Sequence, residues 1–228
     1  MNDTIILITG QLNANFTDRL IESYKNVSNK LISTWKDTPS ELIEKLKKDN
    51  FIILLNDEES LKNDQHKHNR QLLPIRNGIL EAEKLGFKYV MRSRTDIFSN
   101  DFDKYLMKTR SMYQNKLTAI AGINNVKAGV YFLDIIICGE ISKMLSMFVL
   151  KAPNNKKAYE LYLIEMYTKK NKINAEELNQ NFSFSLNTCL ENEIEFIWVR
   201  DGKWKTPKRT IPDMKVIKEY CDDNFILR

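Results

Sequence analysis

The sequence predicts an α/β protein in which a mixed, mostly parallel sheet is flanked by helices. Short apolar runs rich in β-branched residues recur along the first half of the chain, and segments with helical periodicity separate them. Strands that alternate with helices form right-handed βαβ units and a largely parallel sheet. Each run also ends in polar residues. Several polar strand ends are therefore expected at one rim, where open α/β sheets bind ligands.

Length and composition favour one domain over residues 1–228. The chain has only 7 Gly and 5 Pro, and no linker-like or single-sign charge run divides it. The net charge of +5 comes from intermixed basic and acidic residues, which disfavours nucleic acid as a partner. Cys138, Cys189 and Cys221 lack C-x-x-C spacing and are typical of reduced thiols. Because neither a signal-peptide pattern nor a transmembrane segment is visible, we expect a cytoplasmic protein.

The first half is predicted to alternate strands and helices. The expected strands cover 4–9, 31–35, 51–55 and 87–98. Thr17 is the expected N-cap of the first helix, and the capping box Thr38–Glu41 is expected to begin the second.

A third helix is predicted over 69–86, with Gly86 as its C-cap and Pro74 either starting or kinking its regular part. Arg70 and Arg76 lie near its beginning. A helix N-terminus that carries arginines suits an anion such as a diphosphate, so both are candidate ligand-binding residues.

The second half is less regular. Ser99–Asp101 is expected to cap a helix that carries Phe102, Leu106 and Met107 on its apolar face. The remaining expected elements are strands at 117–121, 130–139 and 195–200, a hairpin turn at 201–202, and helices at 140–150, 156–169, 175–190 and 214–220.

The stretch from Arg92 to Asp96 has the strongest signal for a site. An apolar run leads directly into Arg92, Arg94, Thr95 and Asp96, and packing explains charge poorly at the end of a buried strand. A carboxylate beside arginines could hold Mg²⁺ or Mn²⁺ together with a phosphate. An Arg–Asp ion pair that caps the strand explains the same residues equally well.

Asp134 is a second candidate because it stands between two strongly apolar runs. It could act as a general base or accept a substrate hydroxyl, or it could be a hydrogen-bonded structural residue. Glu160 and Asp201 are weaker candidates of the same kind. Asp103, which completes a literal D-x-D with Asp101, is better explained as part of a helix start.

Several familiar nucleotide-binding and catalytic sites lose their main support, because their motifs are absent. The chain has no G-x-G-x-x-G after its first strand, no G-x-x-x-x-G-K-[ST], no G-x-S-x-G and no H-E-x-x-H. His66 and His68 have ligand spacing but no accompanying Cys or further His, so a solvated loop pair is the better interpretation.

Four segments in order resemble the motifs of WavE-type lipopolysaccharide-synthesis proteins, a group that is similar to GT-A glycosyltransferases. The segments are Ile32–Trp35, Asn69–Gln71 followed by Gly78-Ile79, Tyr89–Asp96, and Phe132–Asp134 with Gly139. The resemblance covers roughly residues 4–165. It implies a single GT-A-like (Rossmann-like) domain, with a nucleotide-binding half at about 1–100 and an acceptor half at about 101–228.

The resemblance also implies roles for particular residues. Asp96 matches the surviving aspartate of the GT-A metal motif, and Arg94 stands where an ordinary D-x-D has its first Asp. The expected cofactor is accordingly a divalent metal, Mn²⁺ or Mg²⁺. The residues expected to bind substrate are Thr9, Gly10, Gln11, Trp35, Arg70, Arg76, Arg92, Arg94 and Thr95.

The expected function is a glycosyltransferase of polysaccharide biosynthesis that moves a sugar from a nucleotide-sugar, with UDP-sugars as the first choice of donor, to a glycan acceptor. Asp134 would be the catalytic base of an inverting enzyme. Two alternatives stay open. One is a nucleotidyltransferase that acts on sugar phosphates, and the other is a non-catalytic module that binds nucleotide-sugars or glycans.

Overall fold

The computed structural model describes residues 3–57, 67–123, 130–150, 159–173, 182–185, 197–200 and 203–205. Within this part of the chain, no helix is both long and apolar enough to cross a membrane.

A seven-stranded sheet with the order β3-β2-β1-β4-β7-β6-β8 forms the centre of the protein. Strands β1 to β4 are all parallel to their neighbours within this group, β7 is antiparallel to both β4 and β6, and β8 is parallel to β6. The predicted mixed, mostly parallel sheet is therefore confirmed. The strands are β1 (Thr4–Thr9), β2 (Lys30–Trp35), β3 (Ile52–Asn56), β4 (Tyr89–Arg94), β6 (Leu117–Ile123), β7 (Val130–Glu140) and β8 (Phe182–Ser185).

A second, three-stranded sheet has the order β10-β9-β5. Its strands are β5 (Ile97–Phe98), β9 (Ile197–Arg200) and β10 (Lys203–Lys205). The hairpin predicted around 201–202 is present as the antiparallel pair β9 and β10.

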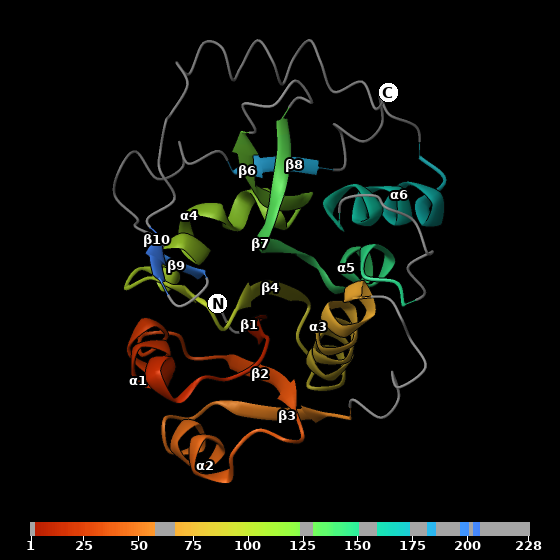
Figure 1. Ribbon diagram of the computed structural model, residues 1–228. Helices are drawn as coiled ribbons and strands as arrows, with labels where there is room; N and C mark the ends of the chain where they lie inside the picture. The colour runs from red at the N-terminus through yellow and green to blue at the C-terminus, as the bar shows by residue number, and fades with distance from the viewer. Residues whose placement is uncertain are drawn as a thin grey trace.

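Helices cover both faces of the large sheet, as expected for strands that are buried on both sides. Helices α1, α2 and α4 lie on one face, and α3, α5 and α6 lie on the other (Figure 1). Their bounds are α1 (Ala14–Ser23), α2 (Ser40–Lys48), α3 (Lys67–Lys84), α4 (Phe102–Tyr113), α5 (Ile141–Met147) and α6 (Tyr159–Asn171).

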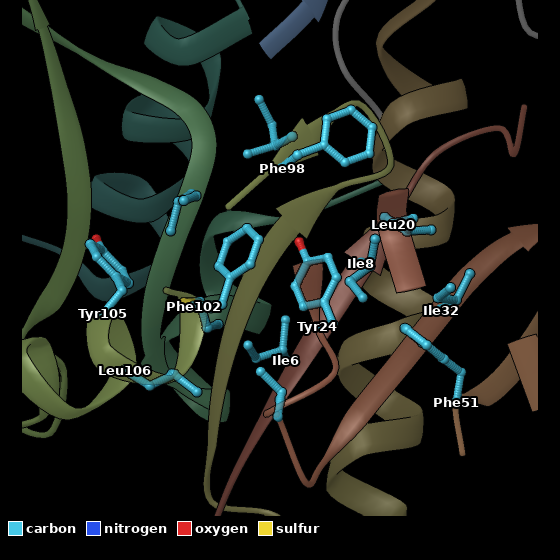
Figure 2. Close-up of a cluster of buried hydrophobic side chains, with 14 of the residues drawn as sticks. Ile6, Ile8, Leu20, Tyr24, Ile32, Phe51, Phe98, Phe102, Tyr105 and Leu106 are labelled. Carbon is cyan, nitrogen blue, oxygen red and sulfur yellow. The ribbon is translucent and has the colours of Figure 1, made fainter. Parts of the chain in front are cut away.

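The described residues form two hydrophobic cores, one on each face of the sheet. Figure 2 shows the core beneath α1, α2 and α4, in which Tyr24 stacks on Phe102 with ring centroids 4.2 Å apart. Because strand side chains alternate between faces, Met91 of β4 belongs to this core and Val90 to the core beneath α3. The same alternation places Arg92 and Arg94 on the α3 side of the sheet.

Helix α3 approaches β1 closely because Gly78 faces the sheet. A Cβ added at Gly78 would lie 2.3 Å from Cδ1 of Leu7, a residue that is fully buried. Pro74 lies inside α3 rather than at its start. Proline has no N–H, so the helical hydrogen bond to the carbonyl of Arg70 is not made at this turn. The first half of α3 lies beside the carboxyl ends of the strands, where Arg70, Gln71 and Pro74 line a pocket.

Two helix starts differ from the predictions. Helix α1 begins at Ala14, and its N-cap Asn13 accepts a hydrogen bond from the backbone N–H of Asn15. The predicted cap, Thr17, lies inside the helix and donates to the Asn13 carbonyl. The N-cap of α2 is Pro39, and the Thr38 hydroxyl pairs instead with Thr34 at 3.2 Å. In both cases the hydroxyl that was expected to cap the helix forms a hydrogen bond with another group.

Three further differences arise from long-range pairing and packing. The predicted strand 87–98 is broken at Thr95 and Asp96, because β5 pairs with β9 in the second sheet. Part of the helix predicted at 175–190 is the strand β8, which pairs with β6. Met107, expected on an apolar face, is 53% exposed. The rest of 175–190 and the helix predicted at 214–220 lie outside the described residues.

Candidate functional site

One pocket of about 840 Å³ lies at the carboxyl ends of β1, β2 and β4, beside the first half of α3. These strand ends meet there because the strands are parallel neighbours in the sheet. Most of the residues predicted to bind substrate line it: Thr9, Gly10, Gln11, Trp35, Arg70, Arg92, Arg94 and Thr95, together with the predicted metal ligand Asp96. Residues that the sequence analysis did not select also line it: Leu12, Asn13, Phe16, Asp37, Gln71 and Pro74.

The loop after β1 is held against the turn after β4. The backbone N–H of Thr95 donates to the Thr9 carbonyl at 3.1 Å, and the Thr95 hydroxyl donates to the Gln11 carbonyl at 2.9 Å. Gly10 has a φ of +137°, and a Cβ on it would lie 2.5 Å from Oγ1 of Thr95. Only glycine meets both requirements, the unusual φ and the close approach, without strain. Together these contacts build one wall of the pocket.

Arg92 brings a positive charge deep into the pocket. Its side chain is almost completely buried, and its Nε donates to Oγ1 of Thr9 at 3.3 Å. The Thr9 hydroxyl donates in turn to the Ser93 carbonyl at 3.2 Å. A buried guanidinium is costly unless negative charge or acceptors surround it, so an anionic ligand in this pocket would be stabilised by it.

Arg94 and Asp96 form a bidentate ion pair at the pocket. The Nε of Arg94 lies 2.8 Å from Oδ1 of Asp96, and Nη2 lies 2.8 Å from Oδ2. The two side chains are 25% and 30% exposed. The ion-pair explanation of this stretch is thus realised, and both oxygens of the predicted metal ligand already accept hydrogen bonds from an arginine.

The acidic groups of the pocket do not make a metal cluster. Asp37 follows β2 and Asp96 follows β4, and β1 lies between these strands. Among the described residues, no three His, Cys, Asp or Glu side chains are grouped so that they could hold a metal ion. Asp96 and Arg94 as they stand do not fit the metal site that the resemblance implies.

Buried hydrogen bonds connect the elements whose ends form the pocket. The Tyr24 hydroxyl donates to Oγ of Ser93 at 2.9 Å, and burial raises the pKa of this phenol well above its usual value, so it stays neutral. At the end of β3, the amide of Asn56 donates to Oγ of Ser33 at 2.9 Å and accepts from Asn77 of α3 at 2.9 Å. These bonds join the end of α1 to β4, and they join β3 to both β2 and α3.

Arg76 is not among the residues that line the pocket. Its Nη1 donates to the carbonyls of Leu145 and Phe148, each at 3.3 Å, at the end of α5. A cation there also compensates the helix dipole. The structure therefore gives Arg76 a packing role, whereas Arg70, nearly two turns earlier on the same helix, reaches the pocket.

Asp134 lies on β7, and the structure describes its backbone but not its side chain. Arg92 of β4 pairs with Ile137, and β7 runs back from there toward Asp134, past the carboxyl end of β4. The pairing of β6 with β7 also shifts register here, because neighbouring residues Ala119 and Ile120 pair with Ile137 and Leu133. Asp134 thus lies in a bulged segment beside the pocket rim, a common place for functional residues.

Asp37 is the most informative residue that the sequence analysis passed over. It follows Trp35 by two positions in the polar run after β2, and this position is the only feature of the sequence that points to a place at the site. The structure brings both residues to the pocket wall that lies farthest from Arg94 in strand order.

No family model matches the chain, and no curated protein matches it. Solved structures with a similar arrangement include a mannose-1-phosphate geranyltransferase from Thermus thermophilus, at 13% identity over 85% of this chain and 75% of that one, with a TM-score of 0.48. A proposed nucleotide-diphospho-sugar transferase from Desulfovibrio desulfuricans has 9% identity over 82% and 80%, with a TM-score of 0.46.

A proposed glucose-1-phosphate thymidylyltransferase from Bacillus anthracis has 12% identity over 86% and 89%, with a TM-score of 0.45. These scores describe a general likeness of shape. The interpretation of the pocket rests on its own residues.

Proposed function

We propose that the protein is a glycosyltransferase that binds a nucleotide-sugar in the pocket at the carboxyl ends of β1, β2 and β4. The observation that carries the proposal is the meeting of Arg70, Arg92 and Arg94, from two elements distant in sequence, in one pocket at the rim of a mostly parallel sheet. Guanidinium groups are the preferred side-chain partners of phosphate oxygens.

The pocket offers different chemistry at its two ends. Trp35 and Asp37 lie at the β2 end, where an indole can stack on a nucleobase and a carboxylate can accept a base N–H. Arg92 and Arg94 lie at the β4 end, and Arg70 lines the pocket from α3. A nucleoside diphosphate has the same polarity, with a planar base at one end and two phosphates at the other, so we propose that it binds in this direction.

The proposed chemistry uses the arginines where charge builds in the reaction. As the sugar leaves its donor, negative charge develops on the nucleoside diphosphate, and guanidinium groups already in place stabilise it. Asp134, from the bulged segment of β7, is the proposed base that would take the proton from the acceptor hydroxyl in an inverting reaction.

A thermal-shift panel of UDP-, GDP-, dTDP-, CDP- and ADP-sugars tests the donor, each with Mn²⁺ or with chelator. We expect one class to raise the melting temperature selectively, because a ligand that binds the folded state stabilises it in proportion to ln(1 + [L]/Kd). UDP-sugars are the first expectation. If none of these donors shifts the melting temperature under either condition, the proposal is wrong.

Product analysis separates the proposal from its alternatives. A glycosyltransferase releases nucleoside diphosphate from the nucleotide-sugar when an acceptor glycan is present, or slowly to water without one. A nucleotidyltransferase would instead consume a nucleoside triphosphate with a sugar phosphate and release pyrophosphate. Binding of the donor with neither product formed, across an acceptor panel, would identify a non-catalytic binding module.

A further inference from the structure

We propose that this pocket binds the nucleoside diphosphate without a divalent cation. The Arg94 guanidinium, held in place by Asp96, supplies the positive charge that a cation would otherwise bring to the phosphates. The inference rests on the proposed function and concerns how the same site recognises its ligand.

The geometry of the Arg94–Asp96 pair is the first argument. Both carboxylate oxygens are engaged, at 2.8 Å each, by Nε and Nη2 of the same guanidinium. A divalent ion bonds to carboxylate oxygens at about 2.1 Å, so an ion on Asp96 would lie close to the guanidinium charge and be repelled by it. This repulsion is weakly screened by solvent, because the pair is partly buried.

The separation of the pocket's acidic residues is the second argument. Asp37 follows β2 and Asp96 follows β4, with β1 between them. Two strand spacings amount to roughly 10 Å. The oxygen ligands of a single Mg²⁺ or Mn²⁺ lie within about 4 Å of each other. The strand order therefore separates the backbones of these two residues, and among the described residues no third His, Cys, Asp or Glu completes a metal-binding group with them.

The direction of the Arg94 side chain is the third argument. Its pairing with Asp96 fixes the guanidinium plane beside the pocket that both residues line. Arg92, almost fully buried on the same face of β4, adds a second charge, and Arg70 approaches from α3. A phosphate-binding group that is already oriented loses little entropy on binding.

Calorimetric titration of the full chain with the nucleoside diphosphate of the selected donor tests the inference, once in EDTA and once in Mn²⁺. We expect the two dissociation constants to agree within about threefold. Binding that is more than about tenfold weaker in EDTA overturns the inference and leaves the proposed function intact. If no nucleoside diphosphate binds under either condition, the proposed function itself fails, and this inference fails with it.

Arg94→Asp is the sharper variant, because it places a second carboxylate two residues before Asp96. We expect binding in EDTA to weaken by at least about tenfold, since a charge-assisted contact is replaced by repulsion, and Mn²⁺ to restore part of it. Lys48→Asp makes the same charge change on the exposed end of α2, away from the pocket, and should leave binding unchanged. Full affinity of Arg94→Asp in EDTA would contradict the role given to Arg94.

Asp96→Asn tests whether Asp96, the ion-pair partner of Arg94, binds a metal ion, because the variant removes the carboxylate without adding a charge. We expect this variant to bind the nucleoside diphosphate in EDTA with an affinity within about tenfold of the wild type, because Arg94 remains. Loss of a Mn²⁺-dependent component in this variant would identify Asp96 as a metal ligand and overturn the inference. Thermal melts of all three variants show whether each is folded before binding is compared.

Discussion

At the scale of single residues, Gly10 shows how closely the pocket wall is built. Its φ of +137° and the 2.5 Å approach that a Cβ would make to Thr95 are separate obstacles to any side chain. Gly86, after α3, has a φ of +85° but no atom within 4 Å of its added Cβ. A side chain at Gly86 would therefore meet backbone strain alone, whereas a side chain at Gly10 would meet both backbone strain and a steric clash.

We expect Gly10→Ala to lower the free energy of unfolding by about 2–4 kcal/mol and Gly86→Ala by about 1 kcal/mol, because only the first adds a clash to the strain. Nucleotide-sugar binding should weaken in Gly10→Ala and stay unchanged in Gly86→Ala. Urea unfolding measures the first quantity and calorimetry the second. Equal stability losses would contradict the close packing of Gly10 on Thr95.

At the scale of elements, α3 divides its arginines between two tasks. Arg70 lies before Pro74 and reaches the pocket, whereas Arg76 lies after it and donates to two carbonyls at the end of α5. In the sequence the two residues are alike, because both lie near the start of the same helix. The orientation of the helix on the sheet, set partly by the close contact at Gly78, separates them.

Arg70→Met and Arg76→Met test this division. Arg70→Met should weaken nucleoside diphosphate binding by about tenfold with little change in stability, because a charge is removed at an exposed position. Arg76→Met should cost about 1–2 kcal/mol of stability, through its lost hydrogen bonds, and leave binding intact. Chemical unfolding and calorimetry on both variants give the comparison, and the reverse pattern would place Arg76 in the site.

At the scale of the whole molecule, buried phenols are distributed over both cores. Burial raises the pKa of Tyr24, Tyr113, Tyr162 and Tyr167 above the ordinary value of 10.0. A group whose pKa is raised by folding contributes its full stability below the unfolded pKa and loses it as the pH rises from there through the folded pKa. The fold as a whole is therefore sensitive to alkali.

We expect the melting temperature to be flat with respect to these groups below about pH 9 and to fall steadily above about pH 10. In an alkaline titration followed by tyrosinate absorbance, the buried tyrosines should ionise only when the protein unfolds. Tyr24→Phe, which loses the bond to Ser93 but keeps the ring on Phe102, should reduce the alkaline loss. Full ionisation of all tyrosines in the folded protein would contradict this account.

The fold class and most of the pocket could be predicted from local patterns. Apolar runs with polar ends identified the strands β1 to β4, and the same ends supplied Thr9, Trp35 and Arg94. Helix starts were less predictable, because Thr17 and Thr38 found backbone or side-chain partners other than a cap. The segment of β8 was predicted as helix, because the spacing of its apolar residues does not reveal that it pairs with β6.

That polar groups follow buried strands can be predicted without a structure, because the alternation of apolar and polar residues is a local property that sets the faces and ends of each element. Which of those groups share one pocket depends on how the elements pack against each other. The order β2-β1-β4 and the approach of α3 bring Arg70 to Arg92 and Arg94 and take Arg76 away. Pairing and packing between distant segments, not sequence spacing, set which of these side chains share a pocket.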